Sequence, residues 1–486
     1  MNDKQLSLVL VGLIAFVAGG FLFMLLRSEP DVDSFKRVTD VRAETLAGHM
    51  GHSPKAEEKE EAIKIGEFFE TFGGKPGETK SVWPHFRGAD YSNIAREEVP
   101  LANSWPKDGP PVLWKLDLSE GHSGAAIWKG RVYLMDYDVE RQGDALRVFS
   151  MADGKEIWRR WYKSPTKVHH GISRTVPAVT DKYVVTIGPK CHVMCVDTET
   201  GDLRWGVDMY ADYGTLMPEW YTAQCPVIDN DIAVVAPCGK EVLMMGISCE
   251  TGEIVWKTPN PDGWNMSHSS IIPMTVLGKK MFVYCTVNGV VAVGADGEDQ
   301  GKVLWKTAEW AHGVTSPSPV KVDDERIFFT VGYGGGSMMM RLKDEGGKIT
   351  PVKEYELTKK VFSCEQQTPI LHEGHLFGIL PNDGGALRNQ FACLSADGKV
   401  VWSSGKTERF GFGPFLQADG KVFVLNDNGE LSLIRASTTG YERLGFCKPL
   451  KGRDAWAPMA LVDGKLVLRD SETVICLDVR ADRSDT

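Results

Sequence analysis

From Val82 onward, the chain alternates between short apolar runs and short polar turns. The runs contain five to eight residues and are separated by clusters of Gly, Asp and Asn. The stretch 175–208 shows the pattern clearly, because TVPAVT, YVVTIGP, HVMCVD and LRWGVD follow one another with turns between them. Short apolar runs bounded by turn residues are typical of β-strands. This part of the chain is therefore predicted to be all-β, with four strands in each unit of the pattern.

Two sequence markers repeat with the same period. In most units a Gly-containing turn leads into an apolar run that carries an aromatic residue: Trp158, Trp205, Trp256, Trp305, Tyr355 and Trp402. The first strands of seven units are marked by prolines at steps of 44 to 50 residues: Pro177, Pro226, Pro273, Pro319, Pro369, Pro414 and Pro458. A proline is tolerated at the start of a strand, where no ladder N–H is lost. Repeats of this length indicate a propeller or a solenoid.

The number of strands indicates how the repeats close. One further first strand begins at 123–125, which gives eight first strands, but the last unit ends near Arg480 after only three strands. The missing strand precedes the first unit as PPVLWKLDL, with Trp114 in the tryptophan position. We therefore predict an eight-bladed β-propeller over 82–480, whose last blade is closed by an N-terminal strand so that no sheet edge is left free. Seven blades is the alternative, because the fifth and seventh units are degenerate.

The N-terminus has a different pattern. Residues Leu6 to Leu26 are uncharged and almost wholly apolar, which is enough to cross a bilayer as a helix. We expect residues 1–27 to be an uncleaved transmembrane signal-anchor, with a cleaved signal peptide as the alternative. Residues 28–81 are expected to form a polar linker, in which 54–72 could form a short helix. Residues 481–486 are expected to be a tail.

The charge and the cysteine content argue against nucleic-acid binding and against a disulfide-stabilised fold. The formal net charge is −10 and no basic stripe is present, which argues against nucleic acid as a partner. Ten cysteines in so large a domain do not suggest a disulfide framework. Cys225 and Cys238 flank a predicted hairpin turn, and a disulfide between them is left open. Three cysteines recur just before a turn of the repeat, where buried thiols pack as small apolar groups: Cys195, Cys393 and Cys476.

The repeat carries a family resemblance. The pattern Gly-x-x-x-Trp, following a strand that ends in Val-Asp or Leu-Ser, resembles the pyrroloquinoline-quinone (PQQ)-like repeat of quinoprotein alcohol dehydrogenases. The opening Trp83-Pro84-His85-Phe86-Arg87-Gly88, with Trp105-Pro106 and Gly109-Pro110-Pro111, resembles a large, mostly uncharacterised bacterial group of such propellers. The similarity covers roughly residues 82 to 480. One such fold hosts many functions, so the resemblance implies architecture rather than activity.

The enzymes of this family would imply a recognisable cofactor site. The resemblance implies that such a quinone site would contain a ring formed by two adjacent cysteines, stacked aromatic side chains, a Ca²⁺ ion held by Glu, Asn and Asp, and a catalytic Asp. This chain has no adjacent cysteines and no CxxCH motif for a covalent haem. It also lacks the GxSxG, HExxH, phosphate-loop and dinucleotide-binding motifs. We expect no cofactor, PQQ included, no metal and no catalytic residue.

One group of side chains remains as a candidate site. Several histidines come shortly before first strands, in connections that run from the outer strand of one blade to the inner strand of the next. Such connections emerge together around the mouth of the central channel, and loops on a rigid scaffold commonly carry binding residues. Packing of the channel rim is the alternative reading. The candidate ligand- or partner-binding residues are His122, His170, Arg174, Trp220, Tyr221, His268, His312, Glu365, Gln366 and Trp456.

These features suggest an extracytoplasmic propeller held at the inner (cytoplasmic) membrane by one helix, with the propeller on the periplasmic side. We expect it to act as a protein-binding or scaffolding module without catalysis, with other envelope proteins as partners. Its layout is similar to that of the propeller lipoproteins of the outer-membrane β-barrel assembly machinery, although no lipid-accepting cysteine is present near the N-terminus. An oxidoreductase with a quinone or metal at the channel mouth, and an extracellular polymer-binding protein, are the alternatives.

Overall fold

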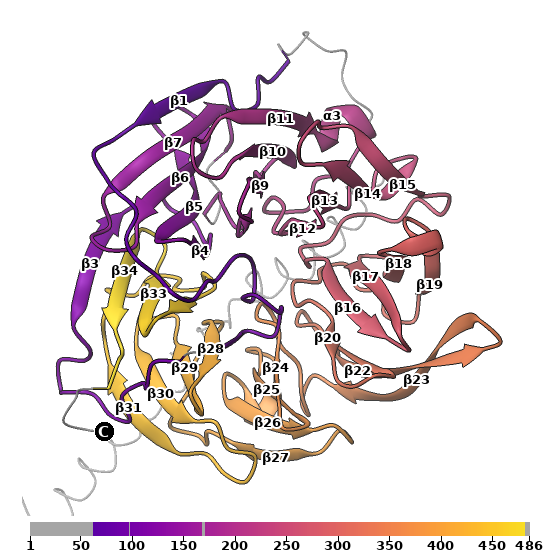
Figure 1. The fold of residues 1–486 in the computed structure, drawn as a ribbon. Helices are drawn as coiled ribbons and strands as arrows, with labels where there is room; N and C mark the ends of the chain where they lie inside the picture. Colours follow the sequence, from indigo (N-terminus) through magenta and orange to yellow (C-terminus); the bar gives the residue numbers. More distant parts are fainter. Residues whose placement is uncertain (1–61, 97, 168–170, 482–486) are drawn as a thin grey trace, which may run out of the picture. The chain divides into compact units, whose positions relative to one another are not determined.

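The structure, a computed structural model, describes residues 62–96, 98–167 and 171–481. The predicted signal-anchor, most of the linker, His170 and the predicted tail after residue 481 lie outside these residues. Within them, no helix has the length and apolar character needed to cross a membrane. Eight sheets follow one another along the chain and surround a common centre, as Figure 1 shows. The predicted eight-bladed all-β propeller is confirmed.

The first four blades each contain four antiparallel strands that run in sequence order from the centre to the rim. Their bounds are β4 (Ala126–Trp128), β5 (Arg131–Asp138), β6 (Gly143–Ser150) and β7 (Glu156–Lys163) in blade 1; β8 (Ala178–Val179), β9 (Tyr183–Ile187), β10 (His192–Asp197) and β11 (Leu203–Asp208) in blade 2; β12 (Val227–Asp229), β13 (Ile232–Val235), β14 (Val242–Ser248) and β15 (Ile254–Pro259) in blade 3; β16 (Ile272–Val276), β17 (Lys279–Thr286), β18 (Gly289–Gly294) and β19 (Val303–Thr307) in blade 4.

Blades 5 to 8 repeat this order, including the two whose repeats are degenerate in sequence. Their bounds are β20 (Val320–Lys321), β21 (Arg326–Thr330), β22 (Gly336–Glu345) and β23 (Lys348–Thr358) in blade 5; β24 (Ile370–His372), β25 (His375–Ile379), β26 (Phe391–Ser395) and β27 (Val400–Ser403) in blade 6; β28 (Phe415–Ala418), β29 (Lys421–Leu425), β30 (Leu431–Arg435) and β31 (Arg443–Cys447) in blade 7; β32 (Ala460–Val462), β33 (Lys465–Arg469) and β34 (Thr473–Asp478) in blade 8. One short helix, α3 (Met209–Tyr213), follows β11, and two single-turn 3₁₀ helices span Gly297–Asp299 and Gly385–Leu387.

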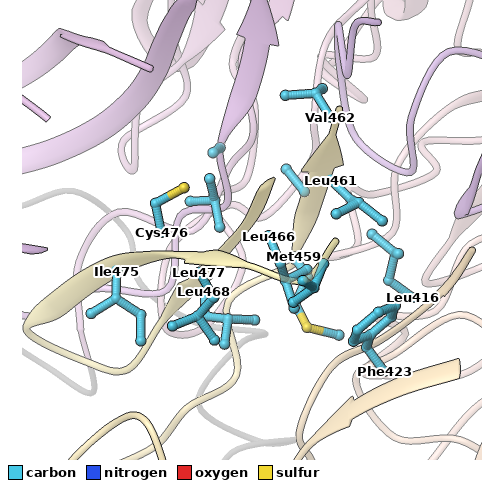
Figure 2. Close-up of a cluster of buried hydrophobic side chains, with 14 of the residues drawn as sticks. Leu416, Phe423, Met459, Leu461, Val462, Leu466, Leu468, Ile475, Cys476 and Leu477 are labelled. Atoms are coloured by element: carbon cyan, nitrogen blue, oxygen red, sulfur yellow. The ribbon is translucent and has the colours of Figure 1, made fainter. Parts of the chain in front are cut away.

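The last blade is closed by the N-terminal strand, as predicted. Strand β3 (Val112–Asp117) pairs antiparallel with β34, and Trp114 stands directly opposite Cys476. The apolar core continues from this blade into its neighbour. Figure 2 shows Leu461 of β32 close to Leu416 and Phe423 of blade 7, and all three belong to one buried cluster.

In most blades the repeat aromatic residue contacts a turn glycine of the next blade. A side-chain carbon at Gly154, in the turn after β6, would lie 3.0 Å from the ring of Trp114, so only glycine allows this close approach. The same contact recurs from blade to blade between glycines at positive φ and the preceding aromatic residue: Gly201 with Trp158, Gly252 with Trp205, Gly301 with Trp256, and Gly398 with Tyr355. These contacts explain why the sequence repeats both the turn glycine and the aromatic residue.

Blade 7 has no aromatic residue in this position, since Gly445 stands where the other blades carry tryptophan or, in blade 5, tyrosine. The N-terminal segment supplies one instead. Trp105 lies over Gly445, within 3.3 Å of where its side-chain carbon would be, and stacks on Phe423 at 6.0 Å between ring centroids. The Trp105-Pro106 motif therefore fills a gap that the degenerate repeat leaves.

The cysteines occupy packing positions. All ten are free and buried, so the disulfide left open between Cys225 and Cys238 does not form. Cys225 belongs to an apolar cluster of blades 1 and 2, and Cys238 belongs to a different cluster that extends over blades 2, 3 and 4. The predicted packing role is confirmed for Cys195, Cys393 and Cys476, each of which stands opposite the repeat tryptophan of its own blade. A small side chain at this position leaves room for the indole.

The helix suggested for 54–72 is wrong for the part that the structure describes. Residues Phe68–Thr71 form strand β1, which pairs antiparallel with β7 as a fifth strand of blade 1. Phe68 stacks on Trp161 at 4.3 Å between centroids, and the Trp161 indole N–H donates to Glu70 at 3.1 Å. Backbone pairing with a free outer edge and these ring contacts outweigh the local apolar pattern that suggested a helix.

The segment 83–95, here called the channel segment, crosses the centre of the ring of blades (Figure 1). It begins with paired hydrogen bonds between Trp83 and Ile127 of β4, and ends in β2 (Ile94–Ala95), which runs parallel to β28 of blade 7. Arg87 fixes its middle: the buried guanidinium donates to the carbonyls of Thr368 and Pro369 ahead of β24, and to those of Tyr91 and Ser92. These bonds tie blades 1, 6 and 7 together.

Candidate functional site

A pocket of about 320 Å³ lies where the connections between blades meet around the central channel. Every one of the eight connections from an outer strand to the next inner strand contributes to its lining, through His122, Arg174, Trp220, His268, Ser316, Glu365, Phe412 and Trp456. Phe86 of the channel segment also lines it. We call it the channel-mouth pocket. Its position agrees with the predicted convergence of these loops.

Two groups of aromatic rings form its walls. In the first, Trp220 stacks with His268 at 6.0 Å and with Tyr333 at 6.2 Å between centroids. In the second, Trp456 lies 5.1 Å from His122 and meets Phe412 edge-on at 5.9 Å. Stacked rings provide flat apolar faces with polar edges, which suit recognition of planar or cationic groups.

The loop that carries Trp220 is held in an unusual backbone conformation. Trp220 and Tyr221 both have positive φ, 62° and 73°, which is rare for bulky residues. Arg174 Nε donates to the Trp220 carbonyl at 2.8 Å, and the Tyr221 hydroxyl donates to the carbonyl of Lys167 at 2.7 Å. Strained backbone that neighbouring bonds hold in place is common at binding sites.

The basic groups of the first wall have distinct charge states. Burial lowers the pKa of Arg174 to about 10, so its guanidinium remains protonated at neutral pH. Burial, together with the nearby Arg174, lowers the pKa of His268 to about 4, so that imidazole is neutral. This side of the pocket therefore carries one positive charge beside neutral aromatic rings.

The acidic groups at and beside the pocket are Glu365, Asp383 and Asp427. Burial raises the pKa of Glu365 to about 7, with a further contribution from the carboxylates of Asp383 and Asp427. Asp427 accepts hydrogen bonds from the Phe412 backbone N–H and the Trp456 indole N–H, both at 2.8 Å. Asp383 forms an ion pair with Lys359 at 2.7 Å. Glu365 is thus the acidic side chain that faces the pocket itself.

The structure brings together seven of the ten predicted site residues: His122, Arg174, Trp220, His268, Glu365, Gln366 and Trp456. His170 lies outside the described residues. Whether these residues bind a ligand or partner stays a prediction.

Two predicted residues do not line the pocket. His312 packs edge-on against Trp310 at 4.4 Å, and Glu356 of the outer strand β23 is its charged neighbour. It lies midway along a long connection, before the chain reaches the channel. Tyr221 follows Trp220 directly, but its hydroxyl is engaged by Lys167.

Several lining residues were not predicted from the sequence. Tyr333 comes from the turn between β21 and β22, whose Gly-rich sequence indicated only a turn. Phe86 belongs to the motif that carried the family resemblance, and nothing in its spacing indicated that it crosses the channel. Tyr333 lies in the loop between the second and third strands of its blade, and such loops emerge on the same face as the connections between blades. That rule would have identified Tyr333, whereas Phe86 had no comparable signal.

The lining residues do not fit a quinone and its calcium ion. Among the described lining residues, Glu365 is the single carboxylate and Cys225 the single cysteine, and the sequence has no two adjacent cysteines. Burial raises the pKa of Cys225 to about 11, so it is a neutral thiol at physiological pH. Across the described residues, no group of three or more His, Cys, Asp or Glu side chains is placed to hold a metal.

Comparison with solved structures supports the fold. A quinohemoprotein alcohol dehydrogenase from Pseudomonas putida HK5 matches with a TM-score of 0.55 and 12% identity, over 83% of this chain and 81% of that chain. BamB from Moraxella catarrhalis matches with a TM-score of 0.49 and 11% identity, over 76% of this chain and 99% of that chain. At such low identity the first likeness shows a common fold and nothing about activity.

Comparison by sequence gives the family. No curated protein matches the chain significantly. A family model does match, at residues 104–215 and 193–350, which together span just over half of the chain. Its description is outer membrane protein assembly factor BamB. The chain therefore belongs to this family of PQQ-like β-propellers.

Proposed function

We propose that this propeller is a protein-binding module of the bacterial envelope, and that it binds other envelope proteins through the face that carries the channel-mouth pocket. The observation that carries the proposal is the convergence of all eight connections on one pocket with aromatic walls. Aromatic and arginine side chains in a recessed site are typical of the residues that dominate protein interfaces. The description of the family as an assembly factor supports the same kind of partner.

We propose further that the segment Leu6–Leu26 anchors the chain in the inner membrane, with the propeller on the extracytoplasmic side. Its length and composition support this reading. The anchor predicts that the chain stays with membranes after washing at alkaline pH, and that protease added to spheroplasts digests the propeller. Release of the chain by the wash, or protection of the propeller in intact spheroplasts, would contradict the anchor or its orientation.

The binding proposal can be tested by filling the pocket. Ser316 lines the pocket, and among the described residues its hydroxyl forms no hydrogen bond. We expect Ser316→Trp to occupy the pocket without removing a stabilising contact, while Ser316→Ala leaves the pocket open. Tagged full-length chains are recovered from mildly crosslinked native membranes, and the proteins that accompany them are identified by mass spectrometry.

The expected result is a discrete envelope protein that accompanies the wild-type chain and Ser316→Ala but is lost, at least tenfold, with Ser316→Trp. Equal thermal unfolding of the two variants would show that the propeller remains folded. Recovery of the same protein with Ser316→Trp would place the interface elsewhere. Recovery of an envelope polymer with no protein would favour the polymer-binding alternative and overturn the proposal.

A further inference from the structure

Glu365 is held in the channel-mouth pocket by close packing against a glycine. A side-chain carbon at Gly332 would lie 2.3 Å from Cγ of Glu365 and 2.6 Å from its Cβ, so any larger residue at 332 would displace Glu365. Gly332 precedes Tyr333, whose ring belongs to the first aromatic wall. Glu365 therefore has a defined position between two walls of rings.

The carboxyl of Glu365 has no hydrogen-bond or ion-pair partner in the part of the chain that the structure describes, although Arg174 lines the same pocket. Its two acidic neighbours do have partners: Asp427 accepts two N–H groups, and Asp383 pairs with Lys359. A half-buried carboxylate without a partner is costly, and the cost falls when a cation enters.

The surroundings suit a cation on an extended side chain. Tyr333, Phe412 and Trp456 line the same pocket as Glu365, and aromatic faces attract ammonium and guanidinium groups. The volume of about 320 Å³ lies at the lower end of the range for ligand pockets, roughly 300–1,000 Å³. Such a pocket accommodates one inserted side chain rather than a secondary-structure element.

We propose that Glu365 pairs with a basic side chain, the guanidinium of an arginine or the ammonium of a lysine, which a partner protein inserts into the channel-mouth pocket. This inference rests on the proposed function and names the chemistry of its partner. It assigns the specific contact to Glu365 and treats the aromatic rings as the walls that enclose the inserted side chain.

The pairing predicts a pH dependence. Glu365 must be ionised to bind a cation, and its pKa in the free protein is about 7. The charged and titratable groups nearest to it are Asp383, with its partner Lys359, and Asp427. Tyr333 and the positively charged Arg174 line the same pocket. Affinity is expected to be highest above pH 7 and to fall up to tenfold for each pH unit below it, since binding must then displace a proton.

Small probes test the pairing directly. The full-length chain in detergent is titrated with Nα-acetyl-arginine amide, Nα-acetyl-lysine amide and, as the uncharged control, Nα-acetyl-norleucine amide, and binding is measured calorimetrically. We expect at least one basic probe to bind at least tenfold more tightly than the norleucine probe. Glu365→Gln should remove that preference, whereas Glu250→Gln, at an exposed turn distant from the pocket, should retain it. Equal binding of charged and uncharged probes, or an unchanged preference in Glu365→Gln, would overturn the inference.

The partner experiment separates this inference from the proposed function. If Glu365→Gln still recovers the envelope protein that Ser316→Trp loses, the pocket binds a partner without a basic side chain at Glu365, and the inference fails alone. If no variant recovers a partner but arginine or lysine amide binds in the Glu365-dependent way described above, the proposed function fails while Glu365 remains a cation site.

Discussion

Trp114 donates its indole N–H to the backbone carbonyl of Met151 at 3.0 Å, although Trp114 belongs to blade 8 and Met151 to blade 1. The strand that carries Trp114 thus completes the last sheet through β34 and also contacts the first. Comparable bonds join Trp205 to the Cys249 carbonyl and Trp402 to the Ser437 carbonyl. Closure of the propeller therefore uses the same contact that joins blades within it.

The close approach of Gly154 to Trp114 predicts a measurable steric cost. Gly154 and Gly278 both have φ near +71°, so alanine strains the backbone about equally at either position. Only at Gly154 would the added carbon meet a ring, at 3.0 Å, because nothing lies within 4 Å of the corresponding atom at Gly278. We expect Gly154→Ala to lower the unfolding free energy by about 1–3 kcal/mol more than Gly278→Ala. Equal thermal unfolding of the two variants would argue against the ring contact.

The hydrogen bonds of Arg87 are expected to hold the channel segment in place. Its guanidinium donates to four backbone carbonyls in the channel segment and ahead of β24, and lysine could not reach them all. Arg87→Lys should destabilise the propeller by about 2–3 kcal/mol and speed amide exchange in residues 83–95. Arg96→Lys is the matched control, because the side chain of Arg96 is exposed and its pair with Asp90 contributes little. Unchanged exchange in Arg87→Lys would show that other contacts hold the segment.

Because of Asp144, we expect the unfolding free energy of the protein to fall as the pH rises. This side chain is fully buried, and the Tyr162 hydroxyl donates to its Oδ2 at 2.7 Å. Burial raises its pKa from an ordinary 3.8 to about 7, so between these values the folded chain holds a proton that the unfolded chain has lost. A tenfold change in a protonation equilibrium corresponds to about 1.4 kcal/mol, so this group alone removes several kcal/mol of stability across that range.

Asp144→Asn tests this dependence, because asparagine cannot ionise. The difference in unfolding free energy between variant and wild type should shift in favour of the variant as the pH rises from 4 to 8. Comparing the two proteins at each pH cancels the titration of other groups, including histidines with low pKa values. A constant difference across this range would show that Asp144 ionises with its ordinary pKa.

The lining of the channel-mouth pocket predicts that the protein binds neither pyrroloquinoline quinone nor calcium. Purified full-length chain mixed with pyrroloquinoline quinone and Ca²⁺, then freed of excess by gel filtration, should retain neither and should show an unchanged Tm. Stoichiometric quinone absorbance after filtration, or a rise in Tm that requires both additions, would restore the oxidoreductase alternative.

The architecture was predictable because its signals are periodic. Prolines such as Pro177 and aromatic residues such as Trp205 mark first and last strands, and Trp114 ahead of the first unit identified the closing strand. The non-periodic contacts were not predictable in the same way. Strand β1 depends on pairing with β7, and Trp105 fills a space that exists only because position 445 is glycine.

The same distinction holds for the candidate site: residues whose positions the repeat fixes were predictable, and the others were not. Residues close to an inner strand, such as His122 and His268, were placed correctly because the blade geometry fixes where those loops emerge. His312 was misplaced because distance along a long connection does not fix distance from the channel. Phe86 was missed because its position results from the channel segment crossing between blades, which no local pattern reveals.

The most direct test of the account places a photo-crosslinking amino acid in the pocket of the full-length chain in native membranes. Gln366 lines the pocket, and Glu250 lies at an exposed turn away from it. We predict that a photo-crosslinker at position 366 captures a discrete envelope protein on irradiation, whereas one at position 250 does not capture it. Capture of that protein from position 250 but not from 366, or no protein product from 366, would contradict the claim that this face is where the propeller binds its partners.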